Sequence, residues 1–375
     1  MRFLFFCLLA MGCSVPAPLP EAATSPDTGT TPTLEARLHE LVSAPVGDGV
    51  ITVTVDTEPQ TTRRLPSVVV AVVAPGFRGV LTASAPGNPP LDGRTVLPLS
   101  SITKVVTALI ASQDVVAGRF SAEAPLSTLL RPDVAPLVGD RTVLEVVSHT
   151  AGFATNPRNL AFERQPHSPA TGYSRAALID CLKRDGCALG PAPRGRYQYS
   201  NLGIGVLGVA LADFHRTPFA MLLEQRVTGP LGLRETGLVT VDTNADFLEG
   251  RTPAGERVRP ATMGVLEAAG AMTSTADDML RFLDALLAPP PGWGPVLDLV
   301  TRPATPGAKT GWAVDRISPR GIPLLAKSGG QAGYSSMLMW SPTAGVGVVA
   351  LSPAGDVSTT LAALCVDLLE QVQRP

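Results

Sequence analysis

Strand-like sequence at both ends of the chain constrains the fold more than any other feature. Residues 50–55 (VITVTV) and 67–75 (SVVVAVVAP) are rich in β-branched residues, and a glycine-containing turn leads on to GVLTASA. We expect these runs to be adjacent antiparallel strands. Strand character returns as a predicted hairpin over residues 335–353, whereas helical patterns dominate from Ser101 to about Leu287. The sequence therefore predicts an α+β fold, with an antiparallel sheet flanked by helices and an inserted helical subdomain.

Three helices are indicated by periodicity and capping. Residues 34–42 form an amphipathic pattern, and residues 274–287 begin with Ser274 and Asp277 at the spacing of a capping box. Near the C-terminus, a final helix places Cys365 on the same face as several leucines. We therefore expect Cys365 to be a buried core thiol.

The composition indicates a globular protein without a polyanionic partner. The chain has 375 residues, of which 45% are hydrophobic, enough for one large domain or two small ones. Its formal net charge is −2. Because no basic field is present, we predict no nucleic-acid binding.

The N-terminus predicts export to the bacterial cell envelope. Residues 1–12 combine one arginine with a short apolar run that is typical of a signal peptide. The sequence AMGC, which ends at Cys13, resembles the bacterial lipobox, so we expect Cys13 to carry a lipid anchor to the membrane in the periplasm. Residues 13–33 then form a tether rich in proline and threonine. The alternative is an ordinary secretory signal cleaved near Ala22 or Ala23.

The remaining cysteines and histidines do not predict a metal site. Cys181 and Cys187 are close enough to close a small loop in an oxidising compartment, and the sequence leaves open whether that disulfide forms. No pair of cysteines or histidines has the spacing of a zinc site. We predict neither a metal nor an organic cofactor.

A serine and a lysine one helical turn apart are the first candidate site residues. Only four of the 30 basic residues are lysines, and Lys104 follows Ser101 by three positions. In a helix, this spacing presents hydroxyl and amine on one face, as a nucleophile with an adjacent base. A helix N-terminus and a neighbouring cation would lower the pKa of Lys104. Taken alone, the pair also fits an ordinary capped helix with a solvated lysine.

Two further motifs change this interpretation. Tyr199-Ser200-Asn201 follows about a hundred residues later, and Lys327-Ser328-Gly329 precedes the last strands. S-x-x-K, Y-x-N and K-S-G in this order resemble the serine β-lactamase and penicillin-binding-protein superfamily, specifically its class C β-lactamase-like branch. Residues 144–153, 229–237, 268–282 and 327–336 look like the same branch. The resemblance implies one catalytic domain over residues 34–375, with an α/β part (34–106 and 301–375) and a helical part (107–300).

The resemblance also implies catalytic roles. Ser101 would be the acylated nucleophile, and Lys104 would help to remove its proton. Tyr199 would shuttle protons, provided that cationic neighbours lower its pKa. The backbone N–H groups of Ser101 and Gly330 would form an oxyanion hole.

Further residues would bind the substrate. Asn201 would hydrogen-bond a substrate amide and order Lys104. Lys327 and Ser328, followed by Gly329 and Gly330 on an edge strand, would hold the substrate carboxylate.

Three other patterns have less consequential interpretations. Lys309-Thr310-Gly311 is a second K-T-G, but only Lys327 directly precedes the run GGQAGYSS that resembles the family. Residues 203–208 match G-x-G-x-x-G without a βαβ unit, so close backbone packing at a helix start is the better interpretation. We interpret His149 as a hydrogen-bonded supporting residue rather than a general base.

The sequence thus predicts a serine hydrolase that forms an acyl-enzyme with a small-molecule or peptide substrate. We expect a β-lactam or a D-alanyl (peptidoglycan-type) amide, because Lys327 suits a carboxylate-bearing substrate. An esterase of the same family is one alternative, and a slowly deacylating penicillin-binding sensor is another. The oligomeric state is left open.

Overall fold

The computed structural model describes residues 32–240, 247–305 and 308–374. The predicted signal peptide (1–12), the lipidated Cys13 and nearly all of the tether lie outside the described residues. Export and lipid anchoring therefore stay predictions.

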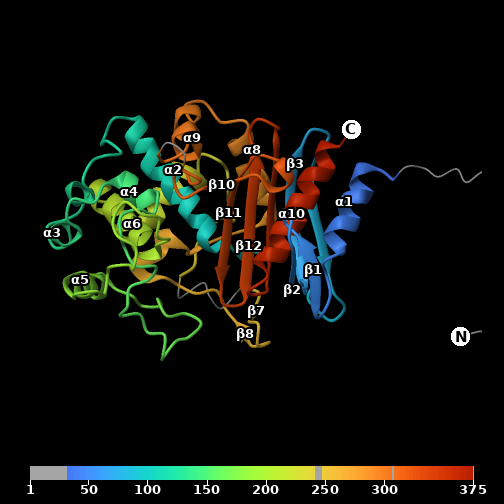
Figure 1. Ribbon diagram of the computed structural model, residues 1–375, viewed down its shortest axis with the longest axis horizontal. Helices are drawn as coiled ribbons and strands as arrows, with labels where there is room; N and C mark the ends of the chain where they lie inside the picture. The colour runs from blue at the N-terminus through green and yellow to red at the C-terminus, as the bar shows by residue number, and fades with distance from the viewer. Residues whose placement is uncertain (1–31, 241–246, 306–307, 375) are drawn as a thin grey trace, which may run out of the picture. The chain divides into compact units, whose positions relative to one another are not determined.

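Six strands within the described residues form the main sheet, in the order β10-β11-β12-β13-β3-β4 (Figure 1). All neighbouring pairs are antiparallel. The pairing of β13 with β3 joins the two ends of the chain, so the predicted α+β class is confirmed. The predicted hairpin over 335–353 is also confirmed, as β12 and β13. The strand bounds are β3 Ser67–Ala74, β4 Phe77–Ser84, β10 Asp315–Ile317, β11 Leu324–Gln331, β12 Tyr334–Ser341 and β13 Val346–Ser352.

The expected position of residues 50–55 was wrong. They form a strand, β1 (Val50–Thr54), but it pairs with β2 (Pro59–Arg63) in a separate two-stranded sheet. Its side chains are exposed or half-buried, whereas most of β3 is buried. A short turn after β1 allows a local hairpin, and this pairing closes a much shorter loop than pairing with β3 would.

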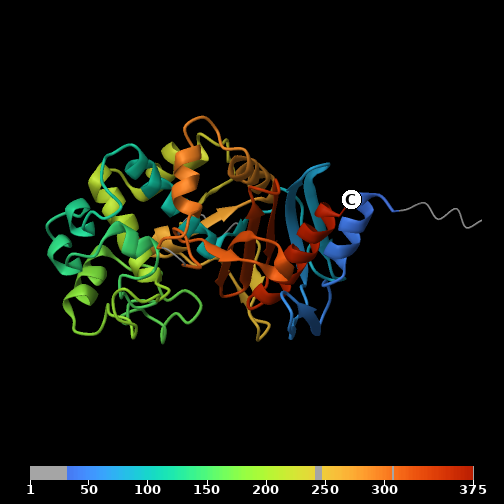
Figure 2. The same cartoon turned by 45° about the horizontal axis from the view of Figure 1, so that its top comes forward.

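The two faces of the main sheet bury separate hydrophobic clusters. On one face, α1 (Leu34–Ser43) and α10 (Ser358–Gln373) pack side by side, and the second view shows both against the strands (Figure 2). The other face packs against α8 (Ala276–Leu287) and the helical part. Because both faces are covered, β3 reads as a continuous apolar run rather than an alternating one.

The remaining helices and the short strands lie between β4 and β10 in the chain. Helix α8 falls within the range 107–300 predicted for the helical part, yet it packs on β3 and β13. No single helix among the described residues is long and apolar enough to cross a membrane, although α6 with residues 219–228 passes as a pair bent by 83°. The helices are α2 Thr103–Val116, α3 Ala135–Val138, α4 Val143–Val147, α5 Arg175–Lys183, α6 Asn201–His215, α7 Phe219–Leu223 and α9 Gly294–Thr301. The short strands are β5 Leu97–Pro98, β6 Gly237–Leu238, β7 Gly250–Arg251, β8 Arg257–Val258 and β9 Met272–Ser274.

Glycines let α6 pack very closely on a 3₁₀ segment, η5 (Gly264–Ala269). A Cβ at Gly205 would overlap Leu266, and one at Gly208 would overlap Ala268. The interpretation of residues 203–208 as close backbone packing is therefore confirmed. This packing places the carbonyl groups at the end of η5 next to α2.

The capping residue of α8 differs from the predicted one. Ser274 is the last residue of β9, and the N-cap is Thr275, whose side chain accepts a hydrogen bond from the Asp278 N–H at 3.2 Å. The cap motif is thus shifted by one residue. Capping boxes overlap in the run TSTADD, so strand pairing of Ser274 with Leu97 decides which one is used.

The structure settles the expectations about the cysteines. Cys181, in α5, and Cys187 form a disulfide, with Cα atoms 5.3 Å apart. Cys365 is a free thiol and fully buried beneath the sheet, which confirms the predicted core position.

We expect reduction of the Cys181–Cys187 disulfide to lower the free energy of unfolding by about 2 kcal/mol, because the bond closes a short loop in the unfolded chain. Urea unfolding with and without reductant measures this difference. The double variant with Cys181→Ala and Cys187→Ala should unfold at a lower urea concentration than the oxidised protein and be insensitive to reductant. Identical midpoints for oxidised and reduced protein would contradict the expectation.

Candidate active site

A tight turn presents Ser101 at the start of α2. Ser101 lies in the 3₁₀ segment η1 (Ser100–Ile102), which runs directly into α2. Ser100 has a φ of +48°, a left-handed conformation that non-glycine residues rarely adopt. The Thr103 hydroxyl donates to the Ser100 carbonyl at 2.6 Å, and the Ser336 hydroxyl donates to the Leu99 carbonyl at 2.8 Å. These bonds hold the turn to both α2 and β12.

Lys104 is a buried lysine beside Ser101. Its side chain is fully buried, with 0% relative exposure. Its Nζ lies 3.1 Å from Ser101 Oγ, 2.7 Å from Asn201 Oδ1 and 2.5 Å from the Ala269 carbonyl oxygen. Three partners therefore surround the nitrogen, drawn from η1, α6 and η5.

The N-terminus of α6 positions Asn201. Ser200 is the N-cap, and its hydroxyl accepts from the Gly203 N–H at 2.8 Å and donates to the Ala154 carbonyl at 2.6 Å. The Asn201 amide donates to Asn156 Oδ1 at 2.8 Å. That bond leaves Oδ1 of Asn201 to accept from Lys104.

Tyr199 and Lys327 complete the group around Ser101. The Tyr199 hydroxyl donates to Ser101 Oγ at 2.6 Å. Both Lys104 Nζ and Lys327 Nζ lie over the Tyr199 ring, at 4.9 and 5.0 Å from its centroid. The structure thus brings together four residues from three separate motifs: Ser101, Lys104, Tyr199 and Lys327.

An open strand edge runs past the serine. Strand β10 pairs only with Leu324, Leu325 and Ala326 of β11, so Lys327 to Gln331 extend beyond it. Ser328 and Gly330 are exposed there. Gly329 is buried against residues 99–101, which we call the serine turn. A Cβ at Gly329 would overlap Ser336 Oγ and the Leu99 carbonyl. Glycine is therefore required for β11 to approach the turn this closely.

Burial lowers the pKa values of both lysines. For Lys104, burial is the larger cause and the positive charge of Lys327 the smaller one, and the pKa lies well below its ordinary value of 10.5. Burial likewise lowers the pKa of Lys327, while Asp315 acts in the opposite direction.

The expected pKa of Tyr199 was wrong. Burial raises it to about 12, while the hydrogen bond with Ser101 opposes the shift and Tyr197 and Asp315 add to it. The phenol is thus neutral over the physiological range. Two lysines over its ring do not reverse the cost of burying a phenolate.

The hydrogen-bond geometry fits a neutral amine at Lys104. Asn201 Oδ1 and the Ala269 carbonyl can only accept, so they take the two protons of an uncharged amine. The lone pair then remains for the proton of Ser101, whose oxygen accepts from neutral Tyr199. An ammonium would instead donate to all three partners and leave the serine proton without an acceptor in this set.

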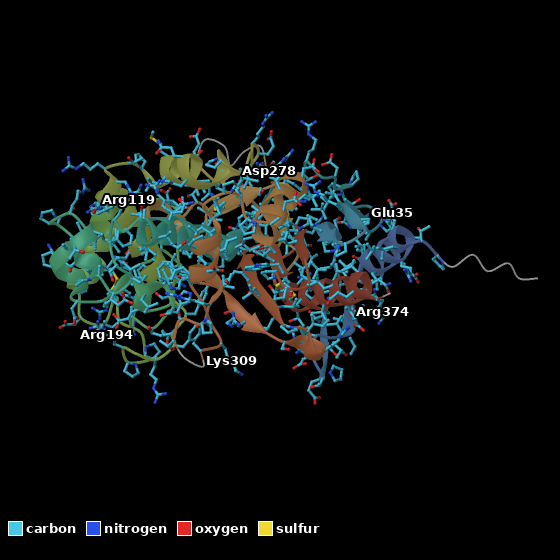
Figure 3. The ribbon with its side chains drawn as sticks, turned by 90° about the horizontal axis from the view of Figure 1, so that it is seen from above. Glu35, Arg119, Arg194, Asp278, Lys309 and Arg374 are labelled. Atoms are coloured by element: carbon cyan, nitrogen blue, oxygen red, sulfur yellow. A yellow bond between two sulfur atoms is a disulfide. The ribbon has the colours of Figure 1, made fainter. Side chains whose placement is uncertain are left out.

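The second K-T-G lies away from this group. Lys309 is exposed, and Figure 3 shows it at the molecular surface. Gly311 packs against the carbonyl groups of Val300 and Arg302, after α9. Lys327, by contrast, is 4% exposed and faces Tyr199.

Comparisons with known proteins identify the family and the fold. Residues 49–358 match the family described as Beta-lactamase. The chain belongs to the beta-lactamase family. Its fold matches a class C beta lactamase from Rhodobacter sphaeroides with a TM-score of 0.67 at 19% identity, covering 83% of this chain and 95% of that one.

Two curated relatives of this beta-lactamase-family protein carry different names. Esterase EstB of Burkholderia gladioli is 28% identical over 234 residues, covering 54% of this chain and 59% of its own length. The D-alanyl-D-alanine-carboxypeptidase/endopeptidase AmpH of Escherichia coli K12 is 28% identical over 210 residues, covering 54% and 52%. The chain thus spans little more than half the length of these relatives.

Sequence reasoning missed several residues of the site in this family member. Asn156 belongs to none of the motifs, and Ala269 lies in a stretch that resembles the family but gave no sign that its carbonyl would contact Lys104. Asp315 forms an ion pair with Lys327. In the sequence it only follows the apolar residues 312–314 and belongs to no motif. Among the described residues, no cluster of three or more histidine, cysteine or acidic side chains could hold a metal ion.

His149 holds the segment that carries Tyr199. Its carbonyl accepts from the Gln198 N–H at 2.7 Å, and its Nδ1 accepts from the Ser200 N–H at 3.2 Å. Its ring also lies 4.8 Å from the Tyr199 ring. Burial, followed by the charges of Lys104 and Lys327, holds its pKa well below 6.5, so the imidazole is neutral with its proton on Nε2. His149 therefore fixes the backbone on both sides of the phenol.

We expect His149→Ala to lower the rate at which Ser101 reacts with a p-nitrophenyl ester by about tenfold, through kcat rather than KM. His149→Asn should retain most of the rate, because asparagine tolerates the φ of +60° at this position and offers an oxygen in place of Nδ1. Steady-state kinetics on both variants, with melting temperatures as a control for folding, checks this. Equal losses in the two variants would contradict the role.

Proposed function

We propose that the protein is a serine hydrolase in which Ser101 forms an acyl-enzyme. The observation that carries the proposal is the position of Ser101 Oγ, between Lys104 Nζ at 3.1 Å and Tyr199 Oη at 2.6 Å. One neighbour can accept its proton and the other can donate one. Such a pair is what nucleophilic attack followed by expulsion of a leaving group requires.

The proposed reaction has two halves. Ser101 Oγ attacks the carbonyl carbon while its proton passes to the lone pair of Lys104. The bond to the leaving nitrogen or oxygen then breaks, and the leaving group takes a proton from Tyr199. The proton that Lys104 holds then passes to the Tyr199 phenolate, which restores the phenol and the neutral amine. Water hydrolyses the ester in the second half, with the same groups acting in reverse.

Backbone groups at the open edge would stabilise the intermediate. The N–H groups of Ser101 and Gly330 are the proposed oxyanion hole, supported by the close approach of β11 to the serine turn at Gly329. Asn201 borders the same space and would hydrogen-bond a substrate amide.

One candidate substrate class is a β-lactam or a D-alanyl amide. Lys327 supports it, because a buried cation beside Tyr199 suits a substrate carboxylate. The name of the relative AmpH agrees with this class.

A second candidate class is an ester with an apolar acyl group. A cavity of about 310 Å³ borders Ser101 and Asn201, and its lining includes the apolar side chains Leu160, Phe162, Pro169, Met263 and Leu266. Apolar lining of this kind suits an aliphatic or aryl acyl group. The name of the relative EstB agrees with this class.

We expect intact-mass spectrometry to show one added acyl group on Ser101 after incubation with a reactive penicillin, a D-Ala-D-Ala peptide or a p-nitrophenyl ester. Ser101→Ala should show none and lose turnover of every substrate that the unsubstituted protein cleaves. Burst and steady-state phases on the same substrates would separate a hydrolase from a protein that deacylates slowly. Full turnover by Ser101→Ala would end the proposal.

We expect the acylation rate to rise with pH. The low pKa of Lys104 means that its amine becomes neutral below the ordinary lysine range, so the rate increases as pH rises through that pKa and then levels. For a neutral ester the plateau should persist, because Tyr199 ionises only near pH 12. For a carboxylate-bearing substrate the rate should fall again as Lys327 loses its charge.

Stopped-flow acylation rates from acidic to alkaline pH check this profile. Lys104→Met keeps an apolar chain of similar length without the base, and should lower the rate by about 10²- to 10⁴-fold while removing the acidic limb. A rate that decreases from acidic to neutral pH would contradict the role of Lys104.

A further inference from the structure

The cation beside the reacting phenol already has an anionic partner. Lys327 Nζ lies 3.6 Å from Asp315 Oδ2. Asp315 is the first residue of β10 and lies opposite Ala326, so it stands at the boundary between the part of β11 that β10 covers and the open edge that starts at Lys327. The lysine side chain is 5% exposed and the aspartate side chain 38%.

Lys327 has no second anion within the part of the chain that the structure describes. Lys104 cannot take its place as a carboxylate binder, because all three positions on its nitrogen are occupied. An anionic group close to the scissile bond would therefore meet Lys327, and with it Asp315.

The chemistry of the leaving group makes this pair important. In β-lactams and in D-alanyl peptides, the carbon bonded to the scissile nitrogen carries a carboxylate. That carboxylate lies within a few atoms of Ser101 Oγ during attack, so it has to share Lys327 with Asp315 or displace it. Two carboxylates beside one buried ammonium leave an uncompensated negative charge.

We propose that Asp315 is a specificity residue, which competes with a substrate carboxylate for Lys327 and so favours esters and amides whose leaving group is neutral next to the scissile bond. This inference rests on the proposed function and decides between its two substrate classes. The negative charge of Asp315 also reaches the phenol, since it contributes to raising the pKa of Tyr199 and of Tyr197.

Other charged side chains near Asp315 act differently. A cavity of about 570 Å³ is lined by Asp315 and Tyr197, and also by Arg196, Lys309 and Arg316. These three cations are exposed, so solvent and salt screen them. They attract any anionic molecule, whereas Asp315 opposes only a group that reaches Lys327.

The test uses two esters that differ in one charge. Phenylacetate esters of 3-hydroxybenzoate and of 3-hydroxybenzamide share the acyl group and the shape of the leaving group, but only the first carries a carboxylate. We expect Asp315→Asn to raise the ratio of kcat/KM for the anionic over the neutral ester by about tenfold. Asp185→Asn removes an exposed carboxylate in the Cys181–Cys187 loop and should leave that ratio unchanged.

The outcomes separate the inference from the proposed function. An unchanged ratio in Asp315→Asn, or an equal loss with both esters, would show that Asp315 only orders Lys327 and would overturn the inference while Ser101 is still acylated. Absence of a Ser101 adduct with either ester, checked against Ser101→Ala by intact mass, would overturn the proposed function and the inference together. If Asp185→Asn raises the ratio as much as Asp315→Asn does, the effect comes from the net charge of the protein rather than from Asp315, and the inference is overturned.

Discussion

The site depends on one buried nitrogen with three hydrogen-bond partners. Burial makes the charged form of Lys104 unfavourable, and the two acceptors at Asn201 and Ala269 fix which way the lone pair of an uncharged amine points. Neither effect would suffice alone. A buried amine without these acceptors would be free to rotate, and a solvated amine with them would remain an ammonium.

The partners come from elements that must approach closely. The Ala269 carbonyl reaches Lys104 because Gly205 and Gly208 let α6 lie against η5. Gly329 likewise lets β11 lie close against the serine turn, because a side chain at this position would overlap the Leu99 carbonyl. These glycines thus set the distances between the groups of the candidate site. Larger residues at these positions would displace whole elements rather than single atoms.

The sequence predicted which site residues are close along the chain, but not how folding surrounds and buries them. Ser101 lies in η1 and Lys104 in the first turn of α2, which follows it directly, so their proximity follows from helical spacing. The pKa of Tyr199 depends on how deeply folding buries it, which no motif records, and the expectation had the wrong sign. The partner of β1 was missed for a related reason, since strand propensity does not say which strand is adjacent. Asp315 is likewise an ordinary aspartate until β10 places it beside Lys327.

The pairing of β13 with β3 has a consequence for biogenesis. Strand β3 is made early and pairs on one side with β4, which follows at once, but its other neighbour, β13, is completed only with Ser352, nearly three hundred residues later. The serine turn packs against β11 and β12, which are also translated near the end of the chain. A nascent chain therefore carries the serine and its lysine long before they can react. The proposed reactivity of Ser101 thus depends on strands that are translated almost last.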